Sequence, residues 1–66
     1  MSKEEEFKLR IAHWRDHNRE HQHTLEQWGA RALAEGRADT AAAMKKAADL
    51  LGQSVAELDK ALETLG

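Results

Sequence analysis

Apolar residues recur at alternating steps of three and four along almost the whole chain, and one short interruption divides the pattern into two runs. The first run is Phe7, Ile11, Trp14, Asn18, His21, Leu25, Trp28 and Ala32. The second run is Ala41, Met44, Ala48, Leu51, Val55, Leu58, Leu62 and Leu65. Such a heptad pattern is typical of α-helices that pack along one seam. It predicts an all-α fold with helices over residues 3–35 and 39–65 and a turn over 36–38.

The predicted helix ends carry recognisable signals. Ser2 and Glu5 have the spacing of a capping box, in which each side chain binds a backbone N–H of the other residue. Gly36 suits the left-handed residue that follows a helix, and Asp39 suits the N-cap of the next one.

Gly52 is the one feature that argues against a continuous second helix. A glycine inside a helix costs about 1 kcal/mol relative to alanine. The segment from Ser54 to Glu57 also has the form of a second capping box. Because the heptad phase passes through Gly52 unchanged, we predict one continuous helix.

The short link determines how the two helices meet. Helices joined by about three residues are antiparallel neighbours, so residues 1–66 are predicted to form one antiparallel two-helix hairpin. Folding the chain at the link pairs positions whose numbers sum to about 75. The predicted pairs are Leu25 with Leu51, His21 with Val55, Asn18 with Leu58, and Trp14 with Leu62.

The chain is short for a stable monomer. Its 66 residues include no cysteine, so disulfides are excluded, and a chain of this size buries only about 60% of its unfolded surface. The second helix has an extra apolar flank, formed by Ala43, Ala47, Leu50 and Ala61. We therefore expect a homodimer that forms a four-helix bundle. The alternative is a single hairpin with exposed alanines. The predicted core and dimer packing residues are Trp14, Leu25, Trp28, Leu51, Val55, Leu58 and Leu62.

Composition argues against several functional classes. Ten basic and twelve acidic residues give a net charge of −2, without the basic stripe of a nucleic-acid-binding protein. No apolar run approaches the ~20 residues of a membrane span. The acidic start, Met1 to Glu6, lacks the apolar stretch of a signal peptide, so a cytoplasmic location is expected. No nucleophile–base pair or phosphate-binding glycine loop is evident, so no enzymatic activity is expected.

The histidines are the main functional clue, because all four lie between residues 13 and 23. His13, His17 and His21 follow one another at steps of four, which brings their side chains above one another on a helix. Two histidines at i and i+4 can chelate one divalent ion, and Glu20 can add an oxygen ligand. His23 is predicted on the opposite face and is set aside. The predicted metal site is therefore His13, His17, Glu20 and His21, with Ni²⁺ or Zn²⁺ as candidate ions.

Two further expectations concern what surrounds this cluster. The second helix has no histidine, so a complete site would take additional ligands from a second copy of the chain across a two-fold axis. Alternatively, Asn18 and His21 form a polar layer in the bundle core that fixes its register without metal. Such a layer would be sensitive to pH, because a buried imidazole resists protonation.

The segment from His13 to His21 reads His-Trp-x-x-His-Asn-x-Glu-His, and Trp28 follows it. This pattern resembles a short helical domain of unknown function in anaerobic bacteria and archaea, found alone or attached to small nickel-binding proteins of the CooT type. The resemblance covers about residues 9–66. It implies a helical hairpin associated with metal handling, with His13, His17, Asn18, Glu20 and His21 as the recurrent residues.

These observations lead to two hypotheses. The first is a small transition-metal-binding or metal-handling accessory protein, with a protein of metalloprotein maturation as a partner. The alternative is a structural homodimerisation module whose histidines form a polar core layer.

Overall fold

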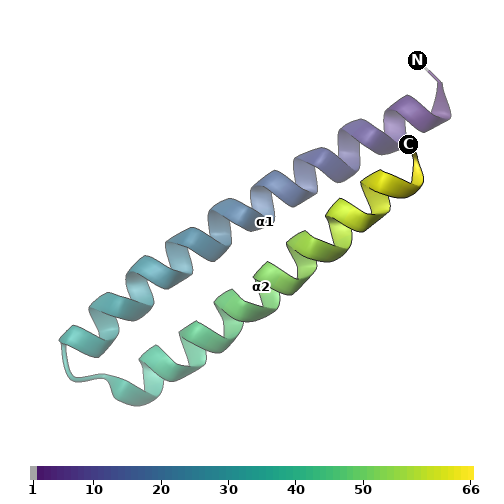
Figure 1. Cartoon of the computed structure of the whole chain (residues 1–66). Helices are drawn as coiled ribbons and strands as arrows, with labels where there is room; N and C mark the ends of the chain where they lie inside the picture. Colours follow the sequence, from purple (N-terminus) through teal and green to yellow (C-terminus); the bar gives the residue numbers. More distant parts are fainter. Residues whose placement is uncertain (1) are drawn as a thin grey trace.

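The protein is a hairpin of two long antiparallel α-helices. The structure, a computed structural model, describes residues 2–66; Met1, which is part of the predicted domain, lies outside them. Helix α1 spans Lys3–Ala34 and α2 spans Ala38–Thr64. The helices lie side by side, so the beginning of α1 and the end of α2 are at the same end of the hairpin, with the first turns of α1 extending beyond α2 (Figure 1). The molecule measures 51 × 16 × 11 Å. The predicted all-α antiparallel hairpin is confirmed.

Helix α1 begins at the predicted cap. Ser2 has extended backbone angles, and its hydroxyl oxygen accepts a hydrogen bond from the backbone N–H of Glu5 at 3.2 Å. Glu4, Glu5 and Glu6 lie in the first turn, where negative charge interacts favourably with the helix dipole.

A Schellman motif ends α1 and reverses the chain. Gly36 has a φ of 79°, in the left-handed region that glycine adopts without steric cost. Its N–H donates to the carbonyl of Leu33 at 3.1 Å, and the N–H of Arg37 donates to the carbonyl of Ala32 at 2.9 Å. These two bonds satisfy carbonyl groups that the helix end leaves without partners.

Helix α2 begins immediately after this motif, which corrects one prediction. Its N-cap is Arg37, which makes no side-chain capping bond, and Asp39 is already inside the first turn. The prediction of Asp39 as N-cap is therefore wrong, because the Schellman motif leaves the chain in position to start a helix earlier. The carboxylate of Asp39 still lies near the positive end of the helix dipole.

Helix α2 continues through Gly52, as the heptad phase predicts. A Cβ atom at this position would lie 2.8 Å from Nε2 of Gln22 on α1. The glycine therefore leaves room for the side-chain amide of Gln22 at the helix interface. Ser54, the first residue of the suspected second capping box, lies within the helix and uses its hydroxyl for a contact with α1.

The buried centre of the hairpin consists of small side chains. Ala48 is 1% exposed, Ala41 and Val55 are 8% exposed, and Gly29 of α1 is also buried. Small residues at a helix contact allow the two backbones to approach closely. The predicted packing residues Leu25, Leu51, Leu58 and Leu62 are half-buried.

The contact surface of α1 differs from the predicted seam by one residue at every second position. All buried or half-buried positions of α1 except Ala12 form two lines with seven-residue spacing: Ile11, Asn18, Leu25 and Ala32, and beside them Arg15, Gln22 and Gly29. The first line belongs to the predicted seam, whereas the second replaces Trp14, His21 and Trp28. Those three side chains are exposed in the hairpin. They therefore lie beside the contact with α2 rather than at its centre, where the prediction placed them, and Trp28 still borders a groove with Met44 of α2.

The register between the helices is close to the prediction. Arg15 contacts Asp59 and Gln22 lies against Gly52, so the numbers of each pair sum to 74, near the predicted 75. Asn18 binds Ser54 rather than the predicted Leu58, which lies one turn further along α2. Neither helix, over residues 2–66, has a segment of the length and hydropathy needed to span a bilayer.

Candidate functional site

His17 and His21 form a close pair on the outside of α1. Their Nε2 atoms are 3.0 Å apart. The ring centroids are 4.5 Å apart, with the ring planes at 86° to one another. Both side chains are exposed. The i, i+4 spacing therefore brings the two imidazoles together edge to face with their outer nitrogens converging.

The other two predicted ligands stay outside this pair. The ring of His13 is stacked on that of His17 with a centroid distance of 6.0 Å, and Glu20 is exposed. Among residues 2–66, no three histidine, aspartate or glutamate side chains gather closely enough to hold a metal ion. His23 lies next to Gln27, with 3.3 Å between their Nε2 atoms. One hairpin thus supplies two converging imidazoles.

The distance within the pair fits two chemical states. A nitrogen–nitrogen distance of 3.0 Å is that of an N–H···N hydrogen bond, in which one ring donates and the other accepts. It also fits two nitrogens bound to one ion, because Zn–N distances of about 2.0–2.1 Å place two ligands about 3 Å apart. The separation of the two nitrogens is therefore compatible with either a hydrogen bond or chelation of one ion.

Asn18, predicted to share a polar layer with His21, has a different partner. Its side-chain Nδ2 donates to the hydroxyl oxygen of Ser54 across the interface at 3.0 Å. Asn18 and Ser54 are half-buried, whereas His21 is exposed. The layer predicted from Asn18 and His21 does not form inside the hairpin, because His21 lies one residue away from the contact surface.

Arg15 makes a second polar contact across the interface. Its Nε donates to Asp16 Oδ1 at 3.0 Å, and its Nη1 donates to Asp59 Oδ1 at 3.2 Å. Arg19 adds longer ion pairs to both carboxylates, at 3.7 Å and 3.9 Å. The hydrogen bonds to Asp16 and Asp59 raise the pKa of Arg15 above its ordinary value. Neither Arg15 nor Asp59 was predicted from the sequence to contact the other helix. The signal was the seven-residue spacing of Arg15, Gln22 and Gly29 beside the seam.

A third feature of the surface is an exposed apolar face beside the histidine pair. Phe7, Trp14 and Trp28 are 57%, 50% and 53% exposed. With His21 they form a line of seven-residue spacing along one side of α1. Trp28 and Met44 line the same shallow groove of about 260 Å³, so this line and the Met44 side of α2 border one face of the hairpin. We call this the tryptophan face, made of Phe7, Trp14, His21 and Trp28 on α1 with Met44 of α2 at its edge.

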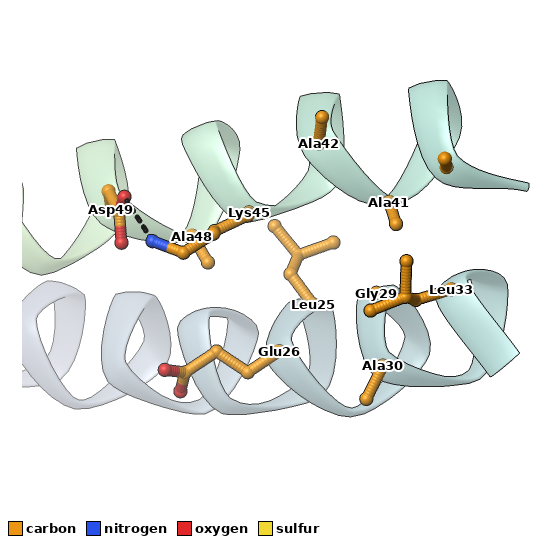
Figure 2. A pocket seen from close by; sticks show the side chains of 11 residues that line it. Leu25, Glu26, Gly29, Ala30, Leu33, Ala41, Ala42, Lys45, Ala48 and Asp49 are labelled. Atoms are coloured by element: carbon orange, nitrogen blue, oxygen red, sulfur yellow. Dashed lines mark hydrogen bonds and ion pairs between the residues drawn. The ribbon is translucent and has the colours of Figure 1, made fainter.

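A larger groove of about 420 Å³ lies near the loop end of the hairpin. Figure 2 shows Leu25 pointing from α1 toward α2, with Ala41 and Ala48 on the facing helix. Lys45 and Asp49 lie at the rim and form an ion pair of 3.3 Å. No histidine lines this groove, so it is separate from the imidazole pair.

Comparison with known families assigns the chain to a family. Residues 7–65 match the model of the domain of unknown function DUF8180. The chain belongs to this family. The matched part of this DUF8180 domain includes all four histidines and both tryptophans. No curated protein and no solved structure matches the chain significantly.

Proposed function

We propose that this hairpin is a small protein that binds a divalent transition metal through His17 and His21 and serves a metal-handling role rather than an enzymatic one. The observation that carries the proposal is the 3.0 Å between the two Nε2 atoms. Imidazole nitrogens suit Ni²⁺ and Zn²⁺. The exposure of both rings gives an ion direct access from solvent.

The proposal includes self-association into a four-helix bundle. Two histidines fill two of the four positions around a tetrahedral ion. The tryptophan face next to the pair is apolar and exposed, which supports docking of a second chain there. In this scheme the protein delivers or stores the ion for another metalloprotein.

The same face supports a second candidate function. A structural dimerisation module would use Trp14 and Trp28 as anchors. Its histidines would share a hydrogen-bonded proton and bind no metal. Metal binding distinguishes the two candidates directly.

The test is calorimetric titration of the purified protein with Ni²⁺ and with Zn²⁺. Saturable binding by the wild type is expected. The double variant His17→Ala/His21→Ala is expected to lose it, because both converging nitrogens are gone. The matched control is His23→Ala, which removes an exposed imidazole elsewhere on α1 and is expected to bind like the wild type. Absence of wild-type binding, or binding that survives in the double variant, would reject the metal site.

A further inference from the structure

We infer that the metal site is completed by a second copy whose α1 packs antiparallel against the first. The two-fold axis passes beside His17, so that His17 and His21 of both copies surround one divalent ion. This inference rests on the proposed metal-binding function and adds the partner, its orientation and the ligand set.

The exposed area of the hairpin supports a second copy as the occupant of the tryptophan face. The chain exposes 5106 Å², which is about 900 Å² more than expected for a compact monomer of 7.4 kDa. A specific interface of standard size removes about 800 Å² from each partner. The excess area of one hairpin is therefore close to what one dimer interface buries.

The spacing of the face is symmetric under an antiparallel two-fold axis. Seven residues separate each member of the line from the next, from Phe7 through Trp14 and His21 to Trp28. In an antiparallel pair, positions of the two copies whose numbers sum to about 35 lie opposite one another. Phe7 then lies against Trp28 of the other copy, and Trp14 lies against His21. Large aromatic side chains then meet across the interface at both ends of the contact. Each ring fills space between residues of the opposite helix.

Charge favours the antiparallel over the parallel orientation. In α1 the first turn carries Glu4, Glu5 and Glu6. The groove beside Trp28 is lined by Arg31, Glu35 and Arg37, which leave it one positive charge in excess, because Arg31 pairs with Glu35. The antiparallel arrangement places the acidic turn of one copy near the arginine end of the other. A parallel arrangement would place the acidic turns together, and helix dipoles also favour antiparallel neighbours.

The same axis brings the imidazoles together. His17 and His21 lie within about 6 Å of the axis along the helix. Side chains on a helix lean toward its N-terminus, which moves the His21 imidazole of each copy toward the axis, while His17 starts almost level with it. Each pair already has its Nε2 atoms 3.0 Å apart. Four imidazoles then complete a tetrahedral or square-planar coordination sphere.

Disulfide mapping tests the orientation, because the natural chain has no cysteine. Arg10→Cys and Thr24→Cys change exposed positions of α1 that border the tryptophan face and leave every histidine and tryptophan in place. A disulfide needs Cα atoms within about 7 Å. In the antiparallel dimer positions 10 and 24 of different copies lie at nearly the same level. Each position is about 20 Å or more from its own counterpart.

The expected result is a covalent dimer from an equimolar mixture of the two variants, and little from either alone. Cross-linking of each variant with itself, as in a parallel pair of α1 helices, would overturn the inference. A dimer in which neither the mixture nor either single variant cross-links would also overturn the inference, because α1 would then lie against α2 of the other copy.

The number of metal ions bound per chain tests whether two copies share one metal centre. The same titration distinguishes failure of the shared centre from failure of the proposed metal-binding function. Zn²⁺ and Ni²⁺ are titrated into the wild type and into Trp14→Glu/Trp28→Glu, which places charge on the face and keeps both histidines. One ion per two chains is expected for the wild type, with affinity at least tenfold weaker in the variant. One ion per chain with equal affinity in both proteins would overturn the shared centre and leave the proposed function intact. Absence of binding by the wild type would reject both.

Discussion

Asn18 and Ser54 are joined by a hydrogen bond of 3.0 Å between side chains that face one another across the two helices. On either side of this bond, Arg15 binds Asp59 and Gln22 lies over Gly52. These polar contacts lie among apolar residues such as Val55 and Leu58, whereas the half near the loop is built from small apolar residues. Directional polar contacts fix the register of two helices more strictly than apolar packing does.

The Asn18–Ser54 bond is expected to contribute measurably to stability. Removing both side chains in a double-mutant cycle, with Asn18→Ala, Ser54→Ala and the double variant, should give a coupling free energy of about 1 kcal/mol, typical of a partly buried hydrogen bond. Thermal or urea unfolding measures it. The cycle cancels the gain in helix propensity that each alanine brings. A coupling energy near zero would show that the two side chains do not interact in solution.

Two glycine substitutions are expected to act in opposite directions. At Gly29 a new Cβ would lie 3.6 Å from Met44 Cβ, which is an ordinary contact. Gly29→Ala should therefore raise the free energy of unfolding by about 1 kcal/mol, because alanine is the better helix former. Gly36→Ala should lower it by about 1 kcal/mol, because φ is 79° there. Each change should shift the melting temperature by about 4–8 °C. If both substitutions shifted the melting temperature equally and in the same direction, the helical conformation of Gly29 and the positive φ of Gly36 would be contradicted.

Much of this fold is predictable from local sequence signals. Ser2, Gly36 and the short link determine where α1 begins and ends and how the chain reverses, and each of these acts within a few residues. The heptad phase likewise predicts the continuity of α2 through Gly52. Half of the α1 contact surface, including Asn18 and Leu25, follows from the same pattern.

The rotation of α1 could not be predicted in this way. Two lines flank the shared seam, one with Trp14, His21 and Trp28 and the other with Arg15 and its seven-residue relatives. If the most apolar line of a helix is assumed to face its partner, the line that contains the tryptophans is predicted to face α2. In the structure the smaller and polar line faces α2, because Gly29 permits close approach and Arg15 finds Asp59. Such complementarity depends on the partner helix and is not visible in one helix alone.

The Arg15 contacts are expected to depend on the geometry of the guanidinium group. Arg15→Lys cannot bind Asp16 and Asp59 in the same way, because an ammonium group lacks the planar set of donors. The melting temperature should fall, and the difference from the wild type should narrow in about 1 M NaCl, where charges are screened. Arg10→Lys, which changes an exposed pair with Glu6, is the control and should melt like the wild type.

The direction of the Arg15 pKa shift also predicts its pH dependence. A raised pKa means that the stabilisation by Arg15 is fully present below the unfolded-state value and is lost only as pH rises through the folded-state value. Both lie far above neutral pH. The difference in melting temperature between Arg15→Lys and the wild type should therefore stay constant between about pH 6 and pH 9. A difference that changes over this range would mean that another titrating group drives it.

Metal binding is expected to weaken in acid. Imidazoles bind an ion only in the neutral form, so protons compete with Ni²⁺ or Zn²⁺ for His17 and His21. The apparent affinity should fall between about pH 7.5 and pH 5, and binding at neutral pH should release protons. Calorimetry in two buffers of different ionisation enthalpy measures that release. An affinity that is the same at both pH values would point to oxygen ligands in place of the imidazoles.

The tryptophans provide an optical signal for self-association. Trp14 and Trp28 are about half exposed in the single hairpin, with the Arg31 guanidinium 4.9 Å from the centre of the Trp28 ring. If the tryptophan face is the dimer interface, raising the protein concentration should shift the emission to shorter wavelength and reduce quenching by acrylamide. Trp14→Phe and Trp28→Phe each leave one reporter and keep an aromatic ring in place, so both should show the change. Trp14 should change more, because it lies nearer the proposed axis, whereas Arg31 already covers part of Trp28. Emission that does not change while sedimentation shows a dimer would place the interface on another face, such as the groove near Leu25.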